Sequence, residues 1–176
     1  MRAAADVAKI HRFMAELGEA VRGAGRVYLT GGATALLHGW RGSTVDVDLK
    51  ADPEPAGLFE GIAKLKEILD VNVELAAPDQ FIPEVPGWRE RSPLIARHGA
   101  VEFRHYDLYS QALAKLQRAH ERDLADAEAM VSAGLVQPTR LRELFAAIEP
   151  ALIRFPAISP TDFRARVENF CRRHAA

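Results

Sequence analysis

Hydrophobic positions recur with two different periods over roughly the first hundred residues. Apolar residues at helical spacing predict helices over about 7–21, 33–38 and 58–69. Short alternating or continuous apolar runs predict strands over 27–30, 45–49 and 71–75, and a hairpin over 94–103 around His98-Gly99. Helices and strands interleaved in this order indicate an α/β (α+β) architecture, with a mixed sheet and flanking helices.

The second part of the chain has a different pattern, because after Asp107 only helical periodicity remains. Four helices are expected, over about 107–119, 121–133, 139–149 and 160–173. Prolines between Ala76 and Pro93 predict an extended, structured loop before them. We therefore expect an α/β core over residues 1–106 and a helical C-terminal part over residues 107–176, packed on the core as a single compact unit.

Composition narrows the class of protein. The chain has 176 residues, enough for one well-buried domain. Its net charge of −1 disfavours a globally basic nucleic-acid binder. The single cysteine, Cys171, excludes an internal disulfide framework and fits a reducing compartment. No apolar run is long enough to cross a bilayer, and the N-terminal residues lack the apolar core of a secretion signal, so we expect a cytoplasmic protein with no membrane partner.

A pair of carboxylates is the first candidate site. Side chains alternate along a strand, so Asp46 and Asp48 project from one face of the predicted strand 45–49. Two adjacent carboxylates repel each other unless a cation or proton lies between them, and hard oxygen ligands suit Mg²⁺ or Mn²⁺. Glu74, on the next predicted strand, is a plausible third member. Two metal ions held by these three residues would activate an attacking hydroxyl and stabilise a leaving pyrophosphate.

A glycine turn lies just upstream of the carboxylates. Gly31 and Gly32 let the backbone approach a phosphate, and the helix that begins there presents unpaired N–H groups. Arg41 and Ser43 precede the carboxylate strand and are candidates for contact with phosphate oxygens. Taken alone, a Gly-Gly pair is more often an ordinary turn and an Asp-x-Asp more often a solvated strand face. Their order along the chain favours a site.

These motifs together resemble a known family. Gly31-Gly32, Arg41-Gly42-Ser43-Thr44, Asp46-Val47-Asp48 and Glu74 are similar to the core motif of the DNA polymerase β-like nucleotidyltransferase superfamily. Many members carry Gly-Ser where this chain has Gly-Gly. The Gly-Gly form with its Arg-x-Ser-Thr lead-in looks closer to the AbiEii-like branch, which includes toxin components of bacterial toxin–antitoxin pairs.

A second motif lies in the predicted helices. Lys115, Arg118 and the run Arg122-Asp123-Leu124-Ala125-Asp126 are similar to a helical Lys … Arg-Asp-x-x-Asp motif that AbiEii-like proteins place against the nucleotide. Spacing alone favours a solvated helix with an Arg122–Asp126 pair. The resemblance implies instead that Lys115 and Asp123 bind the nucleotide, and it leaves Arg118 and Arg122 undecided.

The resemblance implies a metal-dependent enzyme that moves a nucleoside monophosphate from an NTP to a hydroxyl acceptor and releases pyrophosphate. Asp46, Asp48 and Glu74 would hold the metal and carry catalysis; Gly31, Gly32, Arg41, Ser43, Lys115 and Asp123 would bind the nucleotide. For a toxin-type member, an RNA such as tRNA is the attractive acceptor, and a cognate antitoxin is the expected protein partner. Two alternatives remain: a non-catalytic nucleotide-binding or interaction module of the same fold, and a small-molecule nucleotidyltransferase that modifies an antibiotic.

Overall fold

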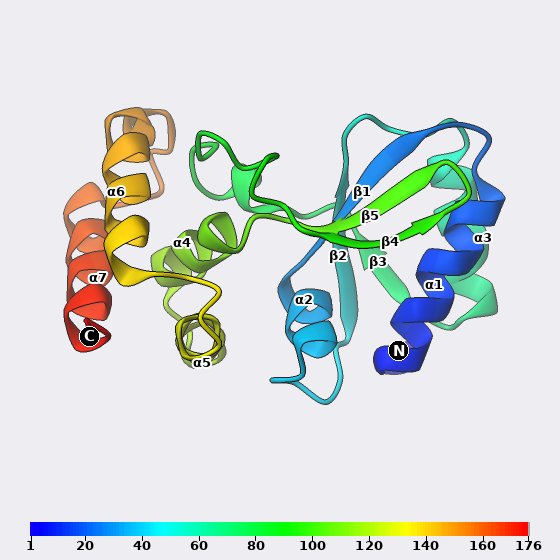
Figure 1. Ribbon diagram of the computed structural model, residues 1–176, viewed down its shortest axis with the longest axis horizontal. Coiled ribbons are helices and arrows are strands. Elements are labelled where there is room, and N and C mark those ends of the chain that lie inside the picture. Colours follow the sequence, from blue (N-terminus) through cyan, green and yellow to red (C-terminus); the bar gives the residue numbers. More distant parts are fainter. Residues whose placement is uncertain (176) are drawn as a thin grey trace. The chain divides into compact units, whose positions relative to one another are not determined.

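A computed structural model describes residues 1–175 (Figure 1). The chain forms two compact units. The first comprises residues 1–77 and 92–106, and the second comprises residues 78–91 and the chain from Asp107 onward. The Pro-rich segment 78–91, which the sequence pattern assigned to the α/β core, thus groups with the helices of the second unit.

The first unit contains the predicted mixture of helices and strands. In chain order its elements are α1 (Val7–Ala20), β1 (Gly25–Thr30), α2 (Gly31–His38), β2 (Asp46–Ala51), α3 (Leu58–Ile68), β3 (Asn72–Glu74), β4 (Leu94–His98) and β5 (Val101–His105). Each lies within a few residues of its predicted position. The predicted α/β (α+β) fold class is confirmed.

The five strands form one mixed sheet in the order β3-β2-β1-β5-β4. Strand β1 pairs antiparallel with β2 and parallel with β5, and β2 pairs parallel with β3. The central position of β1 matters for the site, because its C-terminal end runs directly into α2 at Gly31. The register aligns Glu74 with Asp48, and Asp48 with Thr30, in one row across three strands.

The two faces of this sheet differ in polarity. One face carries the apolar residues of alternate strand positions, including Leu29, Val47 and Phe103, all fully buried in the core of the unit. Helices α1 and α3 contribute to the same core and lie side by side (Figure 1). Because successive side chains of a strand point to opposite faces, the other face receives the polar residues of β1, β2, β3 and β5.

The second unit is helical. Its elements are the 3₁₀ turn η1 (Pro78–Gln80), α4 (Leu108–Arg118), α5 (Glu121–Ser132), α6 (Pro138–Ile148), the 3₁₀ segment η2 (Glu149–Arg154) and α7 (Pro160–Arg173). Helices α6 and α7 run side by side (Figure 1), with Phe145 of α6 packed edge-on against Phe163 of α7 at 4.9 Å between ring centroids. Helix α7 begins at Pro160, directly after the capping residue Ser159.

Segment 78–91 is joined to the start of α4 by an ion pair to a buried carboxylate. Asp107 is fully buried and caps α4, accepting hydrogen bonds from the backbone N–H groups of Tyr109 and Ser110. The Arg91 guanidinium donates to both oxygens of Asp107, at 3.1 and 2.8 Å. Such a two-pronged contact with a buried carboxylate is geometrically specific. It explains why this loop belongs with the helices.

Candidate functional site

Three predicted site residues lie on the polar face of the sheet. Asp46 and Asp48 are two positions apart on β2 and both partly exposed, while the inward residues Val47 and Leu49 are fully buried. Glu74, at the end of β3, is exposed and aligned with Asp48. The predicted alternation of β2 therefore presents both aspartates on one face, in half-solvated positions suited to a ligand.

The glycine turn lies against the second aspartate. Gly31 has a φ of +60°, in the left-handed region that favours glycine. A Cβ at this position would lie only 2.8 Å from the Asp48 Oδ2 atom. The absence of a side chain therefore lets the Asp48 carboxylate lie close to the backbone at the start of α2. The structure brings together Gly31 and Asp48, two of the predicted site residues.

At Gly32, a different neighbour leaves no room for a side chain. A Cβ here would overlap the Thr44 side chain and lie 3.5 Å from an Arg41 guanidinium nitrogen. Thr44 Oγ1 also donates a hydrogen bond to the Asp46 backbone oxygen, at 2.9 Å. The segment that carries Arg41 and the exposed Ser43 thus closes over the glycine turn at Thr44. The sequence pattern indicated no role for Thr44, although this residue is part of the motif Arg41-Gly42-Ser43-Thr44.

The N-terminal segment holds this loop from the other side. Ala5 and Thr44 form an isolated antiparallel bridge, with backbone hydrogen bonds of 2.7 and 3.0 Å in the two directions. Farther back, Arg2 pairs with Glu67 and also donates to the Lys66 backbone oxygen, both at the end of α3. The position of Thr44 over Gly32 therefore depends on residues about forty positions earlier in the chain.

Asn72 is a site residue that sequence analysis missed. Its Nδ2 donates to Asp46 Oδ1 at 2.6 Å and lies 3.4 Å from Glu74 Oε1, so one amide bridges the two carboxylates. The register of β2 and β3, which aligns Asp46 with Asn72, creates the contact. Alternation already put Asn72 and Glu74 on one face, and that is the signal by which Asn72 could have been identified.

Helix α2, which begins at the glycine pair, is anchored by buried polar groups. Thr34 Oγ1 donates to the Leu29 oxygen at 3.3 Å and lies 3.1 Å from His105 Nδ1. The His105 ring in turn lies 4.5 Å from that of His38, centroid to centroid. Burial, with a smaller contribution from His38, lowers the pKa of His105 to about 3. His105 is therefore a neutral support for α2 at ordinary pH.

The second predicted motif forms an ion network inside the second unit. The Lys115 ammonium is 3% exposed and donates to Asp126 Oδ2 at 2.7 Å, with Asp123 Oδ1 at 3.7 Å. Arg118 reaches Asp123 Oδ1 at 2.7 Å. The structure thus brings Lys115 and Asp123 together, in a cluster that joins α4 to α5. Lys115 and Asp123 belong to the second unit, whereas Gly31, Arg41, Ser43 and the three carboxylates belong to the first.

Comparison with known families identifies the class of protein. A family model described as "Nucleotidyltransferase of unknown function (DUF6036)" matches residues 6–173, almost the whole chain. The chain belongs to this family. No curated protein and no solved structure matches it at a significant level. The predicted membership of a nucleotidyltransferase superfamily is confirmed at this level, while assignment to the AbiEii-like branch stays a prediction.

A metal-dependent transfer reaction would need residues that can hold a metal ion. Within residues 1–175, no three or more His, Cys, Asp or Glu side chains are grouped closely enough to hold one. Asp46, Asp48 and Glu74 therefore do not form a closed three-carboxylate site here. The pair Asp46 and Asp48 does fit Mg²⁺, which takes one or two protein carboxylates and completes its shell with water and substrate phosphates.

No helix within residues 1–175 is both long and apolar enough to cross a membrane.

Proposed function

We propose that this protein is a metal-dependent nucleotidyltransferase that moves a nucleoside monophosphate from an NTP to a hydroxyl acceptor, releasing pyrophosphate. The observation that carries the proposal is the alignment of Glu74, Asp48 and Thr30 across three strands, with Asp48 lying against the glycine at the start of α2. Carboxylates and the N-terminal end of α2 thus meet at one end of β1. Membership of a nucleotidyltransferase family supports the same reaction class.

Asp46 and Asp48 are the proposed metal ligands. When bound, Mg²⁺ or Mn²⁺ would polarise the transferring phosphoryl group and stabilise the charge that develops on the leaving pyrophosphate. Asn72 orients the Asp46 carboxylate by donating a hydrogen bond to its Oδ1 atom. Glu74, exposed and beside this pair, is the proposed group that takes the proton of the acceptor hydroxyl.

The phosphates of the NTP are proposed to bind at the glycine turn. Gly31 and Gly32 begin α2, whose N-terminal end carries a partial positive charge that favours a phosphate. Arg41, whose guanidinium lies near Gly32, supplies the cationic contact, and the exposed hydroxyl of Ser43 a further donor. For Lys115 and Asp123 we propose an indirect role, since their ion pairs hold α4 against α5.

The acceptor and partners follow from the resemblance to the AbiEii-like branch. An RNA such as tRNA is the proposed acceptor, and an antitoxin encoded beside this protein is its proposed partner.

A transfer assay tests the reaction. Wild-type protein is incubated with each α-labelled NTP, Mg²⁺ or Mn²⁺ and a total RNA pool, beside Asp48→Asn and the control Glu60→Gln, an exposed carboxylate on α3. We expect label to enter RNA with wild type and the control, and Asp48→Asn to lower the rate by about a hundredfold or more. Failure of every NTP to label RNA, or equal labelling by all three proteins, would contradict the proposal.

A further inference from the structure

The second unit contains a cavity of about 290 Å³ between the C-terminal end of α4 and the first turns of α7. Three apolar residues, Ala157, Ile158 and the fully buried Phe163, contribute to its wall. The polar part of the lining consists of Gln117, Arg118, His120, Ser159, Asp162 and Arg166. All of these residues belong to one compact unit, and none of them takes part in the proposed transfer reaction.

Cationic groups dominate the charge of this lining. It carries the two guanidinium groups of Arg118 and Arg166 against the single carboxylate of Asp162. Arg166 donates to the Gln117 backbone oxygen and so links α7 to α4. Each guanidinium has five N–H donors in a rigid fork that matches a phosphate group. The described bonds of Arg118 and Arg166 therefore leave them able to bind an anion as well.

The first turn of α7 adds to this preference. Ser159 caps the helix by accepting a hydrogen bond from the Asp162 N–H at 3.3 Å. The N-terminal end of a helix of 14 residues carries a partial positive charge that favours anions. The two arginines and this helix end are thus complementary to the same kind of group, a phosphate.

Asp162 restricts which phosphate compound fits. A carboxylate in the lining repels a bare anion, but it accepts hydrogen bonds from the hydroxyl groups of a sugar. The ring of Phe81 lies beside Arg118, with 5.8 Å between the ring centroid and the guanidinium carbon. Phe81 is 41% exposed. An exposed aromatic ring beside an arginine is a surface on which a nucleobase stacks. Phosphate, sugar and base each have a complementary group.

We propose that this cavity binds one ribonucleotide unit, with its phosphate at Arg118 and Arg166 and its sugar hydroxyls at Asp162. The unit is supplied either as a free nucleotide or as one residue of single-stranded RNA. At about 290 Å³ the cavity is at the lower end of the range for small-molecule sites, which suits a single unit. The site is additional to the carboxylate strand and stands independently of the proposed transfer reaction.

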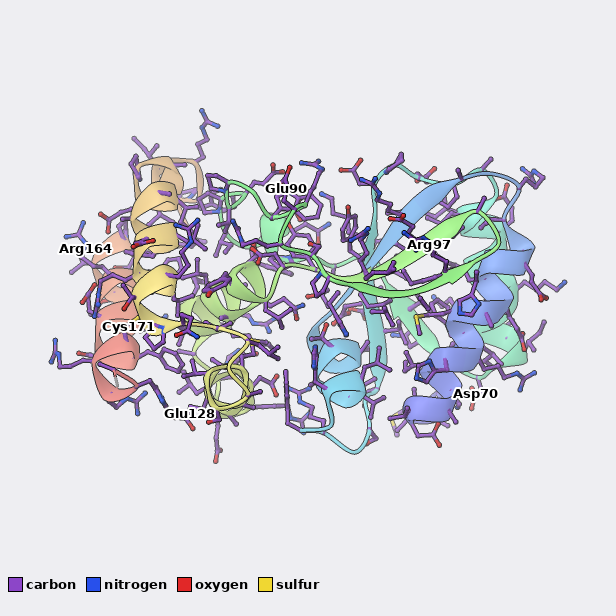
Figure 2. The ribbon with its side chains drawn as sticks, viewed as in Figure 1. Asp70, Glu90, Arg97, Glu128, Arg164 and Cys171 are labelled. Carbon is purple, nitrogen blue, oxygen red and sulfur yellow. The ribbon has the colours of Figure 1, made fainter. Side chains whose placement is uncertain are left out.

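Binding measurements on the whole protein test this site. The probes are AMP, measured by calorimetry, and a labelled six-nucleotide single-stranded RNA, measured by fluorescence anisotropy. EDTA is present throughout, so that nucleotide held through a metal ion at Asp46 and Asp48 does not contribute. The variant is Arg166→Gln, and its matched control is Arg164→Gln. Arg164, labelled in Figure 2, lies on the same helix and pairs with Glu149 outside the cavity.

We expect Arg166→Gln to weaken binding at least tenfold, because a charge-assisted contact to phosphate is lost, and Arg164→Gln to stay within twofold of wild type. If Arg166→Gln weakens the binding of both AMP and RNA, a free nucleotide is sufficient for the site. If it weakens the binding of RNA alone, the ligand is one nucleotide within a strand. If Arg166→Gln lowers the melting temperature, the same binding measurements are made on His120→Asn instead, because His120 also lines the cavity. Absence of binding by both probes, or equal weakening by Arg166→Gln and Arg164→Gln, overturns the proposal.

Discussion

On the sheet of the first unit, Asp46 and Asp48 are partly exposed on a polar face, whereas in the second unit Lys115, Asp123 and Asp126 are buried and paired with one another. Both sets belong to motifs that resemble nucleotidyltransferase signatures. A partly exposed carboxylate can exchange water for a ligand, but a buried ion pair must be broken first, at a high cost in free energy. The comparison teaches that burial distinguishes a candidate ligand site from a structural ion pair with similar residue types.

The largest expected effect comes from removing the buried cation. Lys115→Met should lower the free energy of unfolding by about 3–5 kcal/mol, because it removes the buried ammonium that pairs with the buried carboxylate of Asp126. Denaturant unfolding measures the change, and Lys64→Met, at an exposed position of α3, is the control. A stable Lys115→Met protein that has lost NTP binding would instead assign Lys115 to the nucleotide and remove the contrast between the two units.

In the first unit, the glycine turn should be sensitive to a single methyl group. Gly32→Ala should destabilise the protein by about 1–3 kcal/mol, since the new Cβ overlaps the Thr44 side chain. Gly42→Ala, ten residues later, places its Cβ where no atom lies within 4 Å and should change the unfolding free energy little. Equal unfolding midpoints for the two variants would show that Thr44 does not close tightly over Gly32.

The smallest expected effect concerns the neutral buried histidine, which contrasts with the charged buried residues of the second unit. The folded state holds the pKa of His105 at about 3, below the value of about 6.5 in an unfolded chain. The unfolded state therefore binds the proton first, and stability is lost as pH falls below about 6.5. Between pH 6.5 and 5 the loss of stability amounts to about 1.5 kcal/mol.

Unfolding at several pH values checks this expectation. His105→Gln should flatten the acid side of the stability curve, whereas His11→Gln, an exposed position on α1, should leave the slope as in wild type. An unchanged slope in His105→Gln would show that this histidine does not couple folding to protonation.

The local pattern of the chain predicted its elements well, for physical reasons visible in particular residues. Val47 and Leu49 alternate with Asp46 and Asp48, and such alternation fixes which side chains share a face without knowledge of any partner. Gly31-Gly32 likewise specified where β1 ends and α2 begins.

The hydrophobic pattern could not predict contacts between residues that are distant in the sequence. The strand order, the bridge between Ala5 and Thr44 and the hydrogen bond from Asn72 to Asp46 all depend on packing between segments that are not adjacent in sequence. Lys115 shows the same limit. Helical spacing suggested a solvated face, yet the packing of α4 on α5 buries its ammonium against Asp126.

The bridge between Ala5 and Thr44 has a practical consequence for anyone handling the protein. Truncating the first five residues would remove both backbone hydrogen bonds that hold Thr44, and with them the anchor of the segment above the glycine turn. Any shortening of the N-terminus should therefore retain Arg2 and Ala5, whose contacts hold this segment. Preparations that differ only at the N-terminus should not be assumed to be equivalent in nucleotide-binding assays.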